Sequence, residues 1–346
     1  MTTSTVPAGP PAGPATAGTP DTPAGPGRLR RLLTRLCWPL SAVWALIAVV
    51  RLLGLHVDRW PLAVEPAVVP YAALTAVIPI VAALVARRWL AATLAVAALV
   101  ALVTVVAPRA FGGPDPVRGP AVRVMTANLR EGQADPASVV SLARGQRVDV
   151  LALEEVTPAE FDRLMAAGLA GVLPYWAANP QWVGPAGTAL FSRYPLTGVG
   201  RHPLPNDFTE TLATVQPPGA VPVSIDVIHY CAPVTPNQTA CWNAGVHSIP
   251  PATPKGPVRL LLGDFNMTLD FPDLRHVLAT GYRDAAAVMG DGLAPTFPYL
   301  GPPLPRVTPD HVLADRRIGI SAVSIHPIEG SDHRAVFAEL TFPRAG

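Results

Sequence analysis

The chain has 346 residues, of which 50% are hydrophobic and only 14% are charged. This composition excludes a single ordinary soluble domain and indicates membrane-spanning segments, while 42 prolines exclude a mostly helical bundle. Residues 1–120 carry ten arginines against four acidic residues, whereas residues 121–346 carry sixteen basic residues against twenty acidic ones. The second part therefore lacks the excess of basic side chains that is typical of a nucleic-acid-binding domain.

Residues 1–27 consist almost wholly of Pro, Gly, Ala, Thr and Ser, and Asp21 is their one charged side chain. Such a segment cannot bury enough apolar surface to offset its ordering entropy, so we expect a disordered tail. A signal peptide is disfavoured because the basic cluster and the first apolar run begin only at Arg28.

Three long apolar runs follow, over residues 36–55, 67–86 and 89–107. Each is long enough to cross the hydrocarbon core of a bilayer, so residues 28–107 are expected to form a three-span membrane anchor. Buried core helices are the alternative, which consecutive runs of this length disfavour. The arginines before the first run and the pair Arg87-Arg88 should lie in the cytoplasm. We therefore expect a multi-pass cell-membrane protein with a cytoplasmic N-terminus and an extracytoplasmic C-terminal domain.

Residues 108–120 are rich in Pro and Gly and read as a linker. Beyond them, short apolar runs alternate with helical periodicity, which predicts an α/β domain over residues 121–346. The predicted helices cover residues 137–147, 158–167 and 273–280, and the predicted strands cover residues 122–127, 148–153, 187–192, 221–228, 258–262, 307–314, 318–325 and 335–342. No helix is predicted in the Pro-rich stretch between His229 and Val258.

Polar side chains stand at or just beyond the ends of several predicted strands, at Asn128, Glu155, His229, Asp264 and Asn266. Strand ends meet at the rim of a sheet, where such side chains can form one site. In isolation, a turn explains Asp264 and Asn266, and a structural role explains His229. Their joint occurrence in this order favours a catalytic site.

The residue types at these positions indicate a particular chemistry. Carboxylates at Glu155, Asp264 and Asp332, with the amide of Asn128, make an oxygen-ligand set of the kind that Mg²⁺ prefers. Histidines can move a proton near neutral pH or donate to a phosphoryl oxygen. Together these groups predict metal-assisted attack of water on a phosphoester.

At these residues the chain resembles the endonuclease/exonuclease/phosphatase superfamily. The matching segments are Thr126-Ala127-Asn128-Leu129, Leu153-Glu154-Glu155-Val156, Gly187-Thr188-Ala189-Leu190-Phe191-Ser192-Arg193-Tyr194-Pro195, Ile228-His229, Gly263-Asp264-Phe265-Asn266, Pro309-Asp310-His311-Val312 and Gly330-Ser331-Asp332-His333-Arg334. They extend over about residues 121–342, and an anchor ahead of such a domain resembles a membrane-bound bacterial branch. The resemblance implies a four-layered α/β sandwich, with two packed β-sheets flanked by helices, preceded by three transmembrane helices.

The resemblance also implies which residues act. The implied metal ligands are Asn128, Glu155 and Asp332, and the implied catalytic residues are His229, Asp264, Asn266, Asp310 and His333. The implied ion is Mg²⁺, with Mn²⁺ as an alternative. Asp264 would orient or deprotonate the attacking water, and Asn266 would help to hold that water and the phosphate. His333, polarised by Asp310, would contact the phosphoryl group, and His229 would stabilise charge on the phosphate oxygens.

Two positions depart from the family pattern. Glu154 stands where a Gln is common, which is expected to add a charge near the metal, and Arg130 stands where some nuclease members have an acid.

Cys231 and Cys241 are ten residues apart and can either close a loop in an oxidising exterior or remain free.

The expected function is that of a membrane-tethered, Mg²⁺-dependent phosphoesterase. Its substrate is a nucleic acid, a phospholipid or a small phosphoester, and it contacts the lipid bilayer through three spans; no obligate protein partner is indicated. A non-catalytic binding or scaffold module on the same fold is the alternative. A transporter or channel subunit is disfavoured, because the runs carry no ionisable residue at mid-span.

Overall fold

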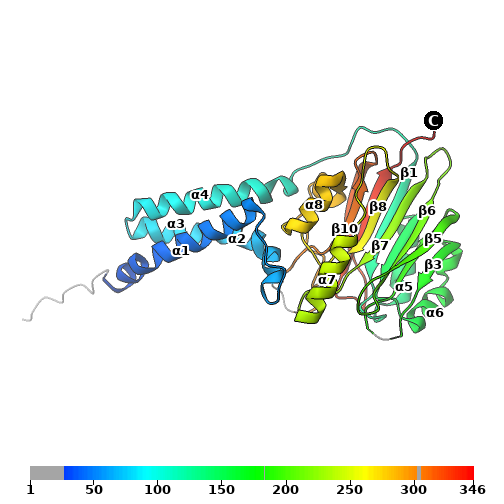
Figure 1. Ribbon diagram of the computed structural model, residues 1–346, viewed down its shortest axis with the longest axis horizontal. Helices are drawn as coiled ribbons and strands as arrows, with labels where there is room; N and C mark the ends of the chain where they lie inside the picture. Colours follow the sequence, from blue (N-terminus) through cyan, green and yellow to red (C-terminus); the bar gives the residue numbers. More distant parts are fainter. Residues whose placement is uncertain (1–26, 183, 302–304) are drawn as a thin grey trace, which may run out of the picture.

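The computed structural model describes residues 27–182, 184–301 and 305–346. A bundle of helices stands beside a domain built from two sheets, as Figure 1 shows. The predicted N-terminal tail lies outside the described residues, apart from Gly27, at which the first helix begins.

The bundle contains two long apolar helices. They are α1 (Gly27–Leu53) and α4 (Trp89–Val106), and α4 continues into the short 3₁₀-helix η2 (Ala107–Ala110). Both are long and apolar enough to cross a membrane over Arg30–Leu53 and Trp89–Ala110. α1 packs against α4 and against α3.

The middle apolar run is not one continuous helix, so the expected number of three transmembrane helices holds only if its two parts form a single bent span. It forms η1 (Leu62–Val68), α2 (Val69–Thr75) and α3 (Val77–Val85), with a bend of 43° between the two halves. The described residues thus hold two membrane-length helices, or three spans if the bent pair counts as one. The cause is Pro79 in the first turn of α3, because it has no N–H to donate to the carbonyl of Thr75.

The C-terminal domain is built on two six-stranded mixed sheets. The first has the strand order β11 (Gly319–Pro327), β12 (Arg334–Thr341), β1 (Ala121–Asn128), β2 (Val150–Glu154), β4 (Thr188–Ser192), β3 (Tyr175–Asn179). The second has the order β5 (Leu196–Pro203), β6 (Thr209–Val215), β7 (Val223–His229), β8 (Val258–Asp264), β10 (Asp310–Asp315), β9 (Tyr282–Asp284). The pairs β1–β2 and β7–β8 are parallel, and the other neighbours are antiparallel.

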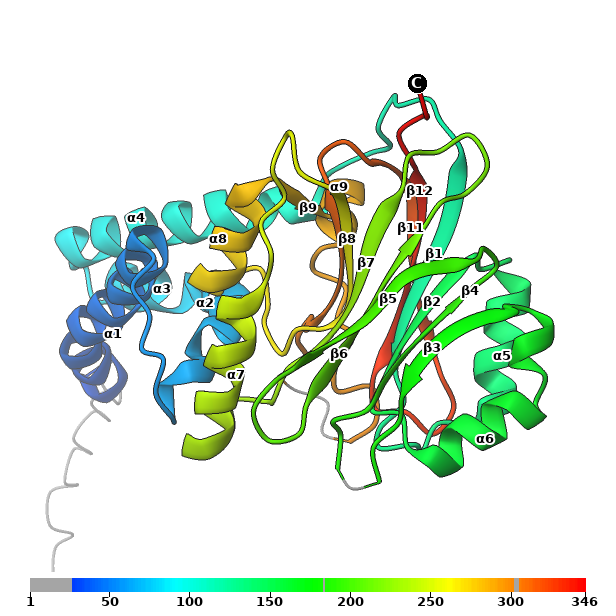
Figure 2. The same ribbon diagram turned by 45° about the vertical axis from the view of Figure 1, so that its right-hand side comes forward.

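Helices cover the outer face of each sheet, so the fold is the predicted four-layered α/β sandwich. α5 (Pro136–Gly145) and α6 (Pro158–Ala166) pack on the first sheet, followed by η3 (Leu169–Gly171). α7 (Pro236–Ser248) and α8 (Pro272–Thr280) pack on the second sheet, and the short α9 (Ala285–Met289) follows β9. Between the sheets lies an aliphatic core to which both contribute, for example Val124 and Leu190 from one and Ile225 and Leu262 from the other. Figure 2 shows α7 and α8 between the second sheet and the anchor helices.

Helix α7 lies in the stretch where no helix is predicted. Thr235 caps it by accepting a hydrogen bond from the Gln238 N–H, and Pro236 occupies its first turn. The same pattern begins α5 at Asp135-Pro136 and α6 at Thr157-Pro158. A capping residue followed by Pro is therefore the sequence signal from which this helix could have been predicted.

Four strands, β3, β5, β6 and β9, also lie outside the predicted strands. β5 is largely exposed at the edge of its sheet, so its sequence contains no apolar run.

The N-terminal helices contact the C-terminal domain through buried polar residues. Asp270, in the segment between β8 and α8, pairs with Arg51 of α1 and with Arg109 of η2. The Tyr71 hydroxyl of α2 donates to the Arg306 carbonyl at 2.9 Å and accepts from the Arg306 N–H at 2.7 Å. The first residues of the predicted linker are therefore packed against the C-terminal domain, since Arg109 is only 7% exposed.

Candidate active site

Strand pairing brings the predicted polar residues to one end of the two sheets. In the second sheet, β7 and β8 run parallel with His229 opposite Asp264, and β10 runs antiparallel to β8 with Asp310 opposite Asp264. In the first sheet, Asn128 is the last residue of β1, and His333 directly precedes β12. The site therefore lies where the ends of both sheets face each other.

Asp264, Asp310 and His333 form the centre of the site. The His333 Nδ1 lies 2.9 Å from Asp310 Oδ2, and its Nε2 lies 3.7 Å from Asp264 Oδ2. Among the described residues, these three offer ligand atoms within 4.8 Å of one another, and all three are buried. The ring is thus held between two carboxylates, with one nitrogen bonded and the other directed toward Asp264.

Glu155 and Asn128 line the adjoining part of the site. The Asn128 side-chain amide donates to Glu155 Oε1 at 2.9 Å and to Asp264 Oδ2 at 3.2 Å. The backbone N–H of Glu131 donates to Glu155 Oε2 at 2.7 Å. The His229 Nε2 lies 3.6 Å from Glu155 Oε1 and 3.9 Å from Asp264 Oδ2. One amide and one imidazole therefore link the two carboxylates.

Burial and mutual charge set the protonation of these groups. Burial lowers the pKa of His333, but the carboxylates of Asp310 and Asp264 outweigh it and raise that pKa to about 10. Burial lowers the pKa of His229 to about 4. Burial raises the pKa of Glu155 to about 7, and burial together with Asp310 raises that of Asp264. At neutral pH the site thus holds one imidazolium and one neutral imidazole.

Two predicted residues stand at the margin of this group. The Asp332 carboxylate lies 3.7 Å from the Arg130 Nε and is partly exposed, so it is not among the three clustered ligands. Asn266 follows Asp264 with a positive φ of 50°; its N–H donates to Asp264 Oδ1, and its side-chain amide donates to the Tyr230 carbonyl. Asn266 therefore fixes the Asp264 carboxylate.

Aromatic residues from loops complete the walls, and no strand-end pattern indicates them. The Phe297 ring lies against His333 with ring centroids 4.6 Å apart, and the Phe208 ring lies 5.2 Å from His229. The guanidinium of Arg334 stacks over Tyr299 at 4.8 Å. The loop that carries Phe297 and Tyr299 therefore shields the imidazolium from solvent.

Glu154 lies in surroundings that disfavour a charged carboxylate. Its side chain is fully buried on β2, and Oε1 accepts a hydrogen bond from the Thr126 hydroxyl at 2.7 Å. Burial raises its pKa well above the usual range, and the nearby Asp310 and Asp264 raise it further. Burial therefore favours the protonated form of this side chain, which is close in shape to the Gln that is common there.

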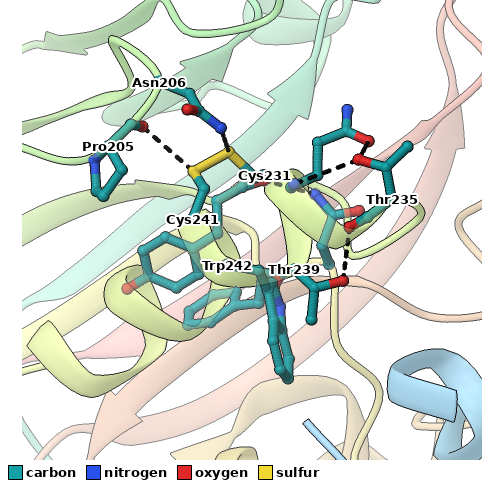
Figure 3. Close-up of a disulfide and its surroundings, with 11 residues drawn as sticks. Pro205, Asn206, Cys231, Thr235, Thr239, Cys241 and Trp242 are labelled. Carbon is teal, nitrogen blue, oxygen red and sulfur yellow. Dashed lines mark hydrogen bonds between the residues drawn. A yellow bond between two sulfur atoms is a disulfide. The ribbon is translucent and has the colours of Figure 1, made fainter. Parts of the chain in front are cut away.

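The structure joins Cys231 and Cys241 in a disulfide, which settles the question that the sequence left open. Cys231 lies two residues beyond His229, and Cys241 lies on α7 (Figure 3). The Asn206 side-chain amide is 3.6 Å from the Cys231 sulfur, and Trp242 is buried beside the bond. The disulfide thus ties α7 to the strand end that carries His229.

A two-sheet sandwich with carboxylates and imidazoles gathered at its strand ends defines a hydrolase of the phosphoester-cleaving class. The chain belongs to the Endonuclease/Exonuclease/phosphatase family, whose model matches residues 125–333. Members of this family are hydrolases that act on phosphoester bonds, and they generally use divalent metal ions.

Solved structures share the fold. The endonuclease/exonuclease/phosphatase from Beutenbergia cavernae is 18% identical with a TM-score of 0.51, over 65% of this chain and 72% of that one. D. rerio TDP2 complexed with a single-strand DNA product is 16% identical with a TM-score of 0.51, over 64% of this chain and 99% of that one. No curated protein matches the sequence.

Proposed function

We propose that the chain is a membrane-tethered phosphoesterase that hydrolyses a phosphodiester or phosphomonoester with the help of a divalent cation, Mg²⁺ or Mn²⁺. The observation that carries this proposal is the position of Asp264, whose carboxylate faces the imidazole of His333, the imidazole of His229 and the amide of Asn128. A carboxylate so placed can take a proton from water while the neighbouring imidazolium faces the phosphate.

The donor set fits a hard cation. Glu155 offers two carboxylate oxygens, and the Asn128 side-chain oxygen, which accepts from the Arg130 N–H at 2.8 Å, is a further oxygen donor beside them. Burial raises the pKa of Glu155 to about 7, so a cation beside its carboxylate would favour the ionised form that binds metal. Asn128, Glu155 and Asp332 are the proposed ligands. When bound, the ion supplies Lewis-acid polarisation of a phosphoryl oxygen.

The protein's own groups perform the proton transfers. Asp264 orients the attacking water and accepts its proton, and the Asn266 N–H bond to Oδ1 holds the carboxylate in place. The imidazolium of His333, held by Asp310, stabilises negative charge on the phosphate and can donate a proton to the leaving oxygen. His229 is neutral and donates a hydrogen bond to a phosphate oxygen.

The proposed organisation assigns residues 28–107 to the anchor, 108–120 to the linker and 121–346 to the catalytic domain. The arginines near the first helix favour a cytoplasmic N-terminus and an extracytoplasmic catalytic domain. A reporter that is active only outside the cytoplasm, fused after Gly346, tests this orientation. If a reporter that is active only in the cytoplasm gives a signal when fused at the same position, the proposed orientation is wrong.

A substrate screen tests the activity. The full chain, purified in detergent, is supplied with Mg²⁺ and a panel of DNA, phospholipid and small phosphodiesters. We expect EDTA-sensitive hydrolysis of at least one substrate and a loss of about 10³-fold or more in Asp264→Asn, which removes the proton acceptor. Asp291→Asn, an exposed acid outside the site, is the matched control. Absence of hydrolysis across the panel would overturn the proposal.

A further inference from the structure

A cavity of about 810 Å³ lies between the anchor and the catalytic domain, apart from the candidate active site. One wall comes from α2 and α4, through residues such as Leu74 and Val103. The opposite wall comes from the segment before β10, through Leu293 and Val307. Most of the lining is apolar, and the volume lies within the roughly 300–1,000 Å³ of small-molecule sites.

The cavity is continuous with the surface that a bilayer would cover. α4 is one of the two membrane-length helices, and Val103 lies near its C-terminal end. Leu74 is 76% exposed in the protein alone, although it is a large apolar residue. Such side chains on a membrane-length bundle face lipid. An acyl chain in the bilayer would therefore lie beside the apolar wall that Leu74 and Val103 give to the cavity.

Two arginines stand at the wall of this apolar space, and they differ in their surroundings. Arg109 lines the cavity, but Asp270 neutralises it. Arg306 has no acidic partner among the described residues, and its Nε is buried without a hydrogen-bond acceptor there. The guanidinium of Arg306 is partly buried, and a buried N–H without an acceptor is unfavourable, so the site is complementary to an apolar ligand with a negative charge.

Short stretches of chain connect this cavity to the catalytic groups. Val307 pairs with Phe297 through backbone hydrogen bonds, and the Phe297 ring lies on His333. Thr308 precedes Asp310 by two residues, and another lining residue, Thr268, follows Asn266 by two. Two residues of extended chain span about 7 Å. A ligand in the cavity is therefore a near neighbour of the candidate active site.

We propose that this cavity receives an acyl chain of a membrane glycerophospholipid, with Arg306 facing its phosphate, and that this lipid is the enzyme's substrate. The proposal rests on the proposed phosphoesterase function and names its substrate class. In the reaction, a P–O bond forms to the oxygen of one water, and the P–O bond to the leaving alcohol breaks. One proton of that water passes to the leaving oxygen, and the product phosphomonoester keeps or releases the other.

The test compares a lipid with a soluble substrate. The full chain is reconstituted in vesicles of equal parts phosphatidylglycerol and phosphatidylcholine, and hydrolysis of phosphatidylglycerol is measured with Mg²⁺. The same preparation is assayed on the soluble diester bis(p-nitrophenyl) phosphate. Leu293→Trp fills the cavity, and Arg306→Gln removes the cation while its backbone bonds to Tyr71 remain possible.

We expect the ratio of lipid to soluble hydrolysis to fall about tenfold in each variant, equivalent to about 1.4 kcal/mol of lost binding. The matched controls are Leu46→Trp, an exposed anchor position away from the cavity, and Arg316→Gln, an exposed arginine elsewhere; both should keep the ratio of the wild type. Hydrolysis of the soluble diester without hydrolysis of the lipid would overturn the inference alone, as would an unchanged ratio in both variants. Hydrolysis of neither substrate would overturn the inference and the proposed function together. Should Leu293→Trp fail to fold, the ratio in Arg306→Gln decides.

Discussion

The contact between the N-terminal helices and the C-terminal domain includes a buried ion group around the carboxylate of Asp270, whose side chain is fully buried. Its Oδ1 lies 2.7 Å from the Arg51 Nε, and its Oδ2 lies 2.8 Å from the Arg109 Nη1. Both arginine side chains are 8% exposed. Asp270→Ala leaves two buried cations without a counter-charge, and breaking a buried ion pair in this way costs about 3–5 kcal/mol.

Thermal unfolding of the full chain in detergent, followed by tryptophan fluorescence, measures this loss. At about 1.4 °C per kcal/mol for a chain of 346 residues, the melting temperature should fall by about 4–7 °C. Asp291→Ala, which removes an exposed acid, is the control and should melt with the wild type.

A second variant tests the electrostatic cause. Replacing all three members of the group, as Arg51→Met, Arg109→Met and Asp270→Leu, removes the buried charges together, so most of the lost stability should return. If Asp270→Ala melts within about 2 °C of the wild type, or if the triple variant is no more stable than Asp270→Ala, the ion group does not hold the anchor in place.

Three further predictions concern the strands and the disulfide around the site. Gly263→Ala should abolish folding, because a Cβ there would lie 1.9 Å from the Ile228 carbonyl oxygen at a φ of +151°; a normal yield of folded protein with a wild-type circular dichroism spectrum would contradict this. Cys231→Ser with Cys241→Ser should lower the free energy of unfolding by about 2–3 kcal/mol, and reductant should destabilise the wild type alone. Burial raises the pKa of Glu210 from 4.5 in the unfolded chain to about 8 in the folded protein. Folding therefore takes up a proton between pH 4.5 and about 8, and the free energy of unfolding of the wild type falls as the pH rises through this range. Glu210→Gln lacks this fall and should be the more stable protein above pH 8 in denaturant titrations; equal pH profiles of the two would refute the assignment.

The N-terminal helices and the candidate active site are joined by one short segment of the chain. Thr268 and Asp270 follow the catalytic turn of Asp264 and Asn266 directly in sequence, and both contact the anchor side of the domain. The segment that leaves the active site is therefore the one on which α1 and η2 are docked.

The sequence determined the local features of this protein. Apolar runs of bilayer length indicated the helices of the anchor, and the Gly263-Asp264-Phe265-Asn266 turn marked a strand end. The alternation of strands and helices likewise predicted the sandwich, since periodicity reflects which face of each element is buried.

Tertiary structure decided the features that depend on distant residues. The edge strand β5 differs from the predictions, because strand pairing outweighs the pattern of apolar residues there. Helix α7 was missed for a different reason, since its signal, Thr235 before Pro236, is local. The protonation of Glu154 and the pairing of Asp270 with two anchor arginines were also hidden in the sequence. A carboxylate's charge depends on how much water surrounds it and which charges face it, and both are fixed only when segments far apart in the chain pack together.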